Sequence, residues 1–284
     1  MVNSAENCKA VTRKVNMKRY ALVGSGIKSI SHLTQESTIF MADCEKLFIL
    51  VNEPILKEYL LKQYQHAEPL DDLYFSTDRR ADNYAAIEAK LIQSLDEYNS
   101  VTFLCYGHPT VFAESGLKVA KQLEGRGDVK VNILPGISAL DCLFADLKVD
   151  PGHCGMVTYE VHDLLVYSKA IEPNSQTVIW QVGMIGNLGK PSYDVNRDAL
   201  IVLKEYLLKY FDENHECVVY EAAMYSGMNH KEVRFKLSEL ESQEYSPIST
   251  LYIPPVSKAR PDNSVRARLG INLRLDGSFR LDLD

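Results

Sequence analysis

YALVGSG, residues 20–26, joins a short apolar run to a turn that contains two glycines. The apolar residues from Tyr20 to Val23 are typical of a buried strand, and the glycines let the backbone approach a neighbouring segment or a ligand closely. Residues 27–43 then indicate a helix, and residues 46–51 a second buried strand. This order of elements predicts an α/β fold.

The alternation of strands and helices continues along the chain. In the first half, helices are predicted at 84–98, at 116–124 and from the N-cap Ser138, and strands at 100–105 and 129–134. In the second half, strands are predicted at 164–168, 177–182, 216–221 and 248–253, and helices at 195–211 and 230–240. Such alternation predicts a mainly parallel sheet covered by helices. The second half is expected to have more antiparallel pairing.

The predicted organisation is two lobes between two terminal segments. Residues 1–18 are polar and basic and are predicted to be an arm, residues 19–134 the N-terminal lobe and residues 135–255 the C-terminal lobe. The last segment, 256–284, contains five arginines and a period-two pattern of apolar residues around Asp276-Gly277. This pattern predicts a terminal β-hairpin.

The composition is that of an ordinary globular protein. The chain has 284 residues, of which 46% are hydrophobic and 24% charged. Its 31 Lys and Arg residues against 38 Asp and Glu residues give a net charge of −7. This charge argues against nucleic-acid or anionic membrane partners, and the apolar runs are too short for a membrane span. The six scattered cysteines form no Cys-x-x-Cys pair, so we expect reduced thiols, no metal and a cytoplasmic location.

The glycine turn by itself is a weak signal for a ligand. A dinucleotide fingerprint needs a third glycine where this chain has Ser29. The acidic residue expected about 20 residues further on is matched only loosely by Glu53. A nucleotide-type ligand and a plain structural turn both stay open for this loop.

Two further motifs follow predicted strands. CYGHPTVF, residues 105–112, lies at a strand end, where open α/β sheets bind ligands. Its His108 has no second metal ligand nearby in the sequence, so a structural role is the simplest interpretation. LPGISALD, residues 134–141, opens a helix whose free amides can hold a carboxylate or a carbonyl group.

YFSTDRRADNY, residues 74–84, has the most distinctive chemistry. Arg80 and Tyr84 share one face if the segment is helical, and Tyr74 lies in the loop before them. Spacing alone favours a solvated arginine stacked on an exposed tyrosine.

Taken together, six motifs resemble those of the tetrapyrrole-methylase-like, S-adenosylmethionine-dependent methyltransferases. More narrowly, the chain resembles the borosin peptide backbone α-N-methyltransferases over residues 19–255. The motifs, which occur in the family's order, are VGSGIKSI (23–30), YGHPTVF (106–112), LPGISALDCLFADLKVDP (134–151), WQVG (180–183), VVYEAAM (218–224) and PISTLYIPP (247–255).

The resemblance implies a two-lobed α/β, class III methyltransferase fold with S-adenosylmethionine between the lobes, S-adenosylhomocysteine as a product, and no metal. The residues that match the family's cofactor contacts are Gly24, Gly26, Tyr106, His108, Val111, Phe112, Ser138, Ala139, Gln181, Tyr220, Ala222, Ser249 and Thr250. The family's catalytic arginine and two flanking tyrosines match Arg80, Tyr74 and Tyr84, and its further tyrosine matches Tyr106.

Methylation of a backbone amide needs a base, because the nitrogen lone pair is delocalised into the carbonyl group. A neighbouring guanidinium favours the phenolate form of a tyrosine. Tyr84 is therefore the expected base, with Arg80 lowering its pKa. Tyr74 and Tyr106 are expected to donate hydrogen bonds to the amide oxygen. This division of roles among the tyrosines is a hypothesis.

The resemblance also implies a peptide substrate. Only 29 residues follow Pro255, and they contain no run of Val, Ile or Gly that resembles a core peptide. We therefore expect a small, separate precursor protein, bound by a homodimer in a 2:2 complex, with the terminal hairpin at the dimer or precursor interface.

Two departures from the family pattern affect this expectation. Thr110 stands where many relatives have glycine, which can reshape the cofactor turn, and the first loop lacks the proline of tetrapyrrole-modifying members. The second departure favours the peptide-modifying branch. The alternatives are a methyltransferase that acts on a porphyrin- or corrin-like ring and an inactive relative that only binds a precursor.

Overall fold

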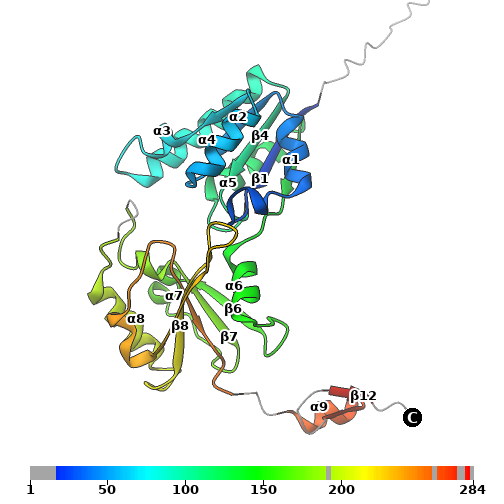
Figure 1. Cartoon of the computed structure of the whole chain (residues 1–284). Helices are drawn as coiled ribbons and strands as arrows, with labels where there is room; N and C mark the ends of the chain where they lie inside the picture. The colour runs from blue at the N-terminus through cyan, green and yellow to red at the C-terminus, as the bar shows by residue number, and fades with distance from the viewer. Residues whose placement is uncertain (1–16, 190–192, 258–260, 274–278, 282–284) are drawn as a thin grey trace, which may run out of the picture. The chain divides into compact units, whose positions relative to one another are not determined.

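The computed structural model describes residues 17–189, 193–257, 261–273 and 279–281. Most of the predicted N-terminal arm, including Cys8, and the predicted turn at Asp276-Gly277 lie outside these residues. The chain forms two compact units, which are drawn in Figure 1. The first unit extends to Val149 and includes the later segment Glu221–Lys231. The helix that begins after Ser138, which the sequence analysis assigned to the C-terminal lobe, thus groups with the first unit.

The first unit is built on a five-stranded sheet in the order β3-β2-β4-β1-β5. All its strand pairs are parallel, as the alternation of elements predicted. The strands are β1 (Lys18–Gly24), β2 (Lys46–Leu50), β3 (Ala67–Pro69), β4 (Ser100–Cys105) and β5 (Val129–Leu134).

Consecutive residues of β1 enter different cores on the two faces of this sheet. Tyr20 and Leu22 belong to a core with α4 and α5, whereas Ala21 and Val23 belong to a core with α1 and α2. These helices are α1 (Gln35–Ala42), α2 (Pro54–Gln63), α4 (Arg80–Glu97) and α5 (Glu114–Glu124). Because side chains alternate along a strand, burial of both faces requires an uninterrupted apolar run.

The neighbouring strands β1 and β4 lead to helices on opposite faces of the sheet. The chain passes from β1 through α1 to β2, and from β4 through α5 to β5. In open α/β sheets, the carboxyl ends of two such strands are the position at which ligands bind. The fold therefore places the loops after β1 and β4 at a ligand-binding position.

The second unit is built on a mixed sheet in the order β6-β7-β10-β8-β9. β6 and β7 are parallel, and β10 is antiparallel to both β7 and β8, which confirms the predicted antiparallel character. The strands are β6 (Met156–Glu160), β7 (Gln176–Trp180), β8 (Glu216–Glu221), β9 (Lys231–Lys236) and β10 (Thr250–Ile253).

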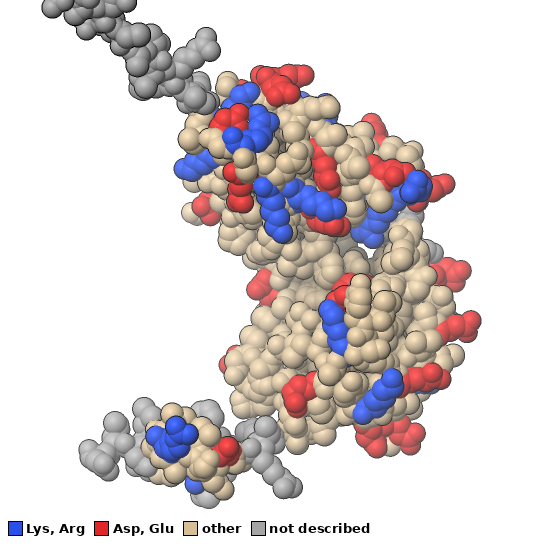
Figure 2. Space-filling model, turned by 180° about the vertical axis from the view of Figure 1, so that it is seen from behind, with Lys and Arg blue, Asp and Glu red and all other residues tan. Residues whose placement is uncertain are grey.

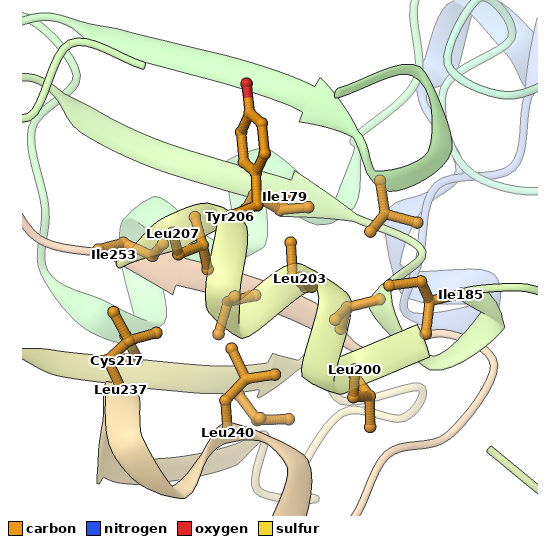
Figure 3. Close-up of a cluster of buried hydrophobic side chains, with 14 of the residues drawn as sticks. Ile179, Ile185, Leu200, Leu203, Tyr206, Leu207, Cys217, Leu237, Leu240 and Ile253 are labelled. Carbon is orange, nitrogen blue, oxygen red and sulfur yellow. The ribbon is translucent and has the colours of Figure 1, made fainter. Parts of the chain in front are cut away.

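Helix α8 (Arg197–Leu207) supplies one side of the core of this unit. Leu200, Leu203 and Leu207 recur at helical spacing and are fully buried. Figure 3 shows them in one cluster with Leu240 and Ile253.

Two predictions for the second unit are wrong. Residues 164–168 were expected to form a strand but mostly belong to helix α7 (Val161–Val166), because the Glu160 side chain caps this helix by accepting a 2.8 Å hydrogen bond from the Asp163 amide. Residues 230–240 were expected to form a helix but form β9 and the start of a 3-10 segment. In β9 only Phe235 is buried, as in an edge strand with one covered face.

The described part of the C-terminal segment contains helix α9 (Asn263–Arg268) and two short strands. β11 (Ile271–Leu273) and β12 (Phe279–Leu281) pair antiparallel, with Ile271 opposite Leu281. This pairing confirms that the terminal segment contains paired strands.

The surface carries charges of both signs. On the face drawn in Figure 2, Lys and Arg side chains are interspersed with Asp and Glu side chains over each unit. Within the described ranges, none of the helices has the length and apolarity needed to cross a membrane.

The contribution of α8 to stability can be measured with two neighbouring substitutions. Leu203→Ala leaves a cavity in the core and is expected to lower the free energy of unfolding by about 2 to 5 kcal/mol. Val202→Ala is the matched control, because Val202 is 54% exposed, and its effect should stay within about 0.5 kcal/mol. Urea denaturation measures both, and equal losses would contradict the assigned core face.

Candidate active site

Three loops meet at the carboxyl edge of the first sheet. The loops after β1 and β4 are joined by an antiparallel bridge, in which Gly26 and Gly107 exchange two backbone hydrogen bonds of 3.1 Å. Gly136, in the loop after β5, packs against both loops. A Cβ atom on Gly136 would lie 2.6 Å from the Gly107 oxygen and 3.0 Å from the Gly24 Cα atom.

The glycines of the first loop are needed for this packing. A Cβ atom on Gly24 would lie 2.3 Å from the Gly107 oxygen, and one on Gly26 would lie 2.3 Å from the His32 Cβ atom. Gly26 also has a φ of +71°, which disfavours other residues. The packing of the loops therefore explains why both positions are glycine, without reference to a ligand.

The turn after β4 holds the imidazole of His108. The Thr110 amide donates to His108 Nδ1 at 3.3 Å, and the Thr110 hydroxyl lies 3.1 Å from the same atom. Because Nδ1 accepts from the amide, Nε2 is the ring nitrogen that can donate. Val111 and Phe112 follow and are 37% and 47% exposed, and Phe112 has a φ of +54°. Thr110, the departure from the family pattern, therefore orients His108.

Ser138 is the N-cap of α6 (Ala139–Leu147), as predicted. Its hydroxyl donates to Asp141 Oδ2 at 2.6 Å and accepts from the Asp141 amide at 3.3 Å, and its own amide donates to Oδ2 at 2.7 Å. The polar groups of the Ser138 side chain and amide are therefore committed to the cap. The next amides, of Ala139 and Leu140, have no acceptor within the helix and are the donors that a ligand can use.

Tyr106 follows β4 and is half-buried. Burial, the Cys142 thiol and the Glu53 carboxylate raise the pKa of Tyr106 to about 12. Its hydroxyl is therefore protonated at neutral pH, which is the state that a hydrogen-bond donor requires.

Glu53 is fully buried, and its carboxylate is held by the first unit itself. It accepts hydrogen bonds from Ser29 Oγ at 2.6 Å, Tyr225 Oη at 2.7 Å, and the amides of Ile55 and Leu56 at 2.7 and 2.6 Å. Burial raises the pKa of Glu53, but these hydrogen bonds together lower it more, so the net pKa is below its usual value. Glu53 thus caps α2 and anchors the Glu221–Lys231 segment through Tyr225.

Tyr74, Arg80 and Tyr84 form a connected cluster in the first unit. Tyr74 ends the short helix α3 (Asp71–Tyr74), and Arg80 begins α4. Arg80 Nε donates to Tyr84 Oη at 2.7 Å, and the Tyr74 and Tyr84 ring centroids are 5.9 Å apart. All three residues are half-buried. The cluster is thus partly desolvated, in contrast to a solvated arginine on an exposed tyrosine.

Arg80 lowers the pKa of Tyr84, as expected from the sequence, but other effects on this pKa are larger. Burial raises this pKa, as does the neighbouring Tyr74, and together they outweigh the lowering effect of Arg80. The net pKa is therefore above 10.0, so Tyr84 is a phenol at neutral pH. Burial lowers the pKa of Arg80, but Tyr84 and Tyr74 raise it more, and the guanidinium stays charged.

Four of the predicted cofactor residues, Gln181, Tyr220, Ser249 and Thr250, lie at one edge of the sheet of the second unit. Gln181 directly follows β7 and has a φ of +58°. Thr250 begins β10 and lies opposite Tyr220 of β8. Ser249 precedes Thr250, and its hydroxyl accepts a 2.8 Å hydrogen bond within its own turn. Ala222 comes directly after β8, in the segment that groups with the first unit.

Asn83 is a buried residue of the tyrosine cluster for which the sequence analysis made no prediction. It is 3% exposed, and its side chain is hydrogen-bonded to the loop that follows Tyr74. An asparagine within a helical pattern is the signal in the sequence that could have indicated this role. Asparagine side chains hydrogen-bond to nearby backbone groups and so compete with helix formation, which makes them uncommon inside helices.

The family of the chain follows from comparison with known proteins. Residues 20–241 match the family model of tetrapyrrole (corrin/porphyrin) methylases. The chain belongs to this family. Membership confirms the predicted fold class and the predicted relation to the tetrapyrrole methylases.

Among the curated proteins, this tetrapyrrole methylase family member is similar to fungal proteins described as a methyltransferase together with a ribosomally synthesised cyclic-peptide precursor. The gymnopeptide precursor of Gymnopus fusipes is 32% identical over 252 residues, which are 87% of this chain and 60% of the relative. The omphalotin A precursor of Omphalotus olearius is 28% identical over 254 residues, with the same coverage of 87% and 60%. The chain thus spans about 60% of the length of these relatives.

Solved structures agree on the fold. Two structures of uroporphyrin-III C-methyltransferase from Thermus thermophilus, the second in complex with S-adenosylhomocysteine, have TM-scores of 0.59 and 0.55 and identities of 19% and 16%. Each match covers 87% of this chain and 99% of the solved chain.

The packing of the three loops predicts a large difference between two glycine substitutions. Gly24→Ala forces a Cβ atom against the Gly107 backbone and should lower the free energy of unfolding by about 3 kcal/mol. Gly127→Ala is the control, because no atom lies within 4 Å of a Cβ built on Gly127. Gly127 has a positive φ, which Gly24 does not have, so a cost of about 1 kcal/mol is expected from the backbone alone. Urea denaturation compares them, and a smaller loss for Gly24→Ala would contradict the packing.

Proposed function

We propose that the chain is an S-adenosylmethionine-dependent methyltransferase that N-methylates backbone amides of a ribosomally made precursor peptide. The observation that carries this proposal is the Tyr74, Arg80 and Tyr84 cluster, in which Arg80 Nε donates to Tyr84 Oη at 2.7 Å. A half-buried guanidinium on a phenol suits proton removal from a very weak acid such as an amide. The descriptions of the fungal relatives, which join a methyltransferase to a peptide precursor, support the same substrate class.

The edge of the first sheet offers groups that fit the proposed cofactor. The amides at the start of α6 and His108 Nε2 are donors, and Val111 and Phe112 are exposed apolar side chains. The uroporphyrin-III methyltransferase of the same fold has been solved with S-adenosylhomocysteine. When bound, S-adenosylmethionine supplies a methyl group on a cationic sulfur. Gln181, Tyr220, Ala222, Ser249 and Thr250 are proposed as its further contacts.

In the proposed reaction, Tyr84 and Arg80 act on the amide proton. Deprotonated Tyr84 Oη removes the N–H proton and so makes the nitrogen lone pair available for the methyl group. Arg80 stabilises the phenolate through the Nε hydrogen bond. The hydroxyls of Tyr74 and Tyr106 donate to the amide oxygen, where negative charge develops. Correct placement of the nitrogen can contribute about 7 to 11 kcal/mol.

We further propose that the precursor is a separate chain and that a homodimer of this chain binds two copies of it. The fungal relatives contain methyltransferase and precursor in one chain, so this arrangement would differ from theirs. The proposed location is the cytoplasm, where S-adenosylmethionine and newly made precursor would both be available.

The substrate class can be tested with a chimera. The part of the gymnopeptide precursor that the match leaves uncovered is joined after Asp284, because tethering gives a weakly bound peptide a high effective concentration. With S-adenosylmethionine, tandem mass spectrometry should find methyl groups on backbone nitrogens of the added segment. Methylation of uroporphyrinogen III with no methylation of the segment would contradict the proposal and favour a ring substrate.

The separate precursor can be tested with the chain alone. After incubation with S-adenosylmethionine and no other protein, its own backbone should carry no methyl group. The same segment, added as a free peptide, should become methylated. Methyl groups on the backbone of the chain itself would contradict the proposed arrangement.

The base role predicts the effect of one hydroxyl group. Tyr84→Phe keeps the ring but removes the proton acceptor, so methyl transfer in the chimera should fall at least about 100-fold. The affinity for S-adenosylmethionine, measured by isothermal titration calorimetry, should not change. Tyr98→Phe, at the other end of α4, is the control and should retain activity. Transfer within a few-fold of the parent in Tyr84→Phe would exclude this base.

The raised pKa predicts a rate that increases with pH. The active form is the phenolate, and because the pKa of Tyr84 lies above 10.0, only a small fraction is deprotonated at neutral pH. Single-turnover transfer should therefore rise about tenfold per pH unit between about pH 7 and about pH 9. A rate that is flat or falls over this range would contradict a phenol base.

A further inference from the structure

Asn83 connects the loop after Tyr74 to helix α4. Its Nδ2 donates to the carbonyl oxygens of Tyr74 at 2.8 Å and Thr77 at 3.0 Å. Its Oδ1 accepts from the Thr77 amide at 3.0 Å and from the hydroxyls of Thr77 and Ser76 at 2.8 and 2.9 Å. The side-chain amide therefore uses both of its donors and its oxygen on this one loop.

Besides these hydrogen bonds, an ion pair of 3.5 Å between Arg79 Nε and Asp82 Oδ2 links the loop to α4. Residues 75–79 are all exposed, and the helix N-cap, Arg79, makes no side-chain capping hydrogen bond. Asn83 itself is 3% exposed, so its hydrogen bonds are shielded from water. In such a site a lost partner leaves a buried polar group unsatisfied, which favours a different loop conformation.

We propose that Asn83 is a positioning residue that holds the Tyr74 ring beside Tyr84 and Arg80, a role that rests on the proposed function. Asn83 directly precedes Tyr84 in α4, so one residue ties the Tyr74 backbone to the helix that carries the other two. The Tyr74 ring then lies 5.9 Å from the Tyr84 ring. The next residue, Phe75, is 54% exposed and packs edge-on against Tyr74, with the ring centroids 4.9 Å apart.

Two variants separate the parts of this role. Asn83→Ala removes every side-chain hydrogen bond from this residue to the loop, whereas Asn83→Asp keeps the acceptor for Thr77 and Ser76 but loses the donors to the Tyr74 and Thr77 carbonyls. Ser94→Ala is the matched control, because Ser94 is a buried polar residue of the same helix whose hydroxyl donates to Leu91 within it.

The test uses the full-length chimera with the gymnopeptide precursor segment. Hydrogen exchange measured by mass spectrometry should become faster for residues 75–79 in both variants, most in Asn83→Ala and less in Asn83→Asp, which keeps the acceptor for Thr77 and Ser76. The single-turnover rate of methyl transfer should fall about 10- to 100-fold in both variants, because small misplacements of catalytic groups have effects of this size. The affinity for S-adenosylmethionine should stay within about twofold, as expected for a site whose other contacts are intact.

The possible failures can be told apart. Parent-like transfer rates in both Asn83 variants, with an active parent, would overturn the role of Asn83 and leave the proposed function intact. An equal loss of rate in Ser94→Ala would also overturn it, since the effect would then reflect the stability of α4 alone. An inactive parent would contradict the proposed function and this role with it.

Discussion

The backbone bridge between Gly26 and Gly107 is the constraint on which the candidate site depends. It joins the loops of two neighbouring strands whose helices lie on opposite faces of the sheet, and Gly136 closes against both. Gly24, Gly26 and Gly136 are required because a Cβ atom on each would lie within 2.6 Å of backbone or of a neighbouring side chain. With the loops held in this way, His108, the exposed Val111 and Phe112, and the free amides of α6 lie at one edge of one sheet.

The tyrosine cluster is governed by a competition between burial and charge. Arg80 lowers the pKa of Tyr84, but burial and Tyr74 raise it more. A phenolate of higher pKa is a stronger base, and it is less abundant at neutral pH. In the proposed base role of Tyr84, the smaller amount of phenolate is offset by its greater basicity, which suits an acid as weak as an amide. The geometry of the cluster in turn depends on Asn83, which ties the loop after Tyr74 to the helix that carries Tyr84.

Much of the first unit could be predicted because its strands are buried on both faces, which requires apolar runs such as the one from Tyr20 to Val23. The second unit was harder. Residues 231–236 have a single buried side chain, Phe235, so the pattern of an edge strand was mistaken for a helix. The sequence identified the residues of the candidate site, but it did not predict their contacts or their burial. The sequence indicates the lowering effect of Arg80 on the pKa of Tyr84, but it does not reveal how far Tyr84 is buried and so does not give the larger opposing effect. Asn83 contacts the loop after Tyr74 only in the folded chain.

A crystal structure of the chain with S-adenosylhomocysteine and the unmodified peptide segment would test the proposed site directly. The cofactor is expected to contact the loops after β1, β4 and β5. The peptide N–H to be methylated is expected to point at Tyr84 Oη, with its carbonyl oxygen near Tyr74 or Tyr106. A peptide bound away from Tyr74, Arg80 and Tyr84, or a cofactor that does not touch these loops, would contradict the proposed site.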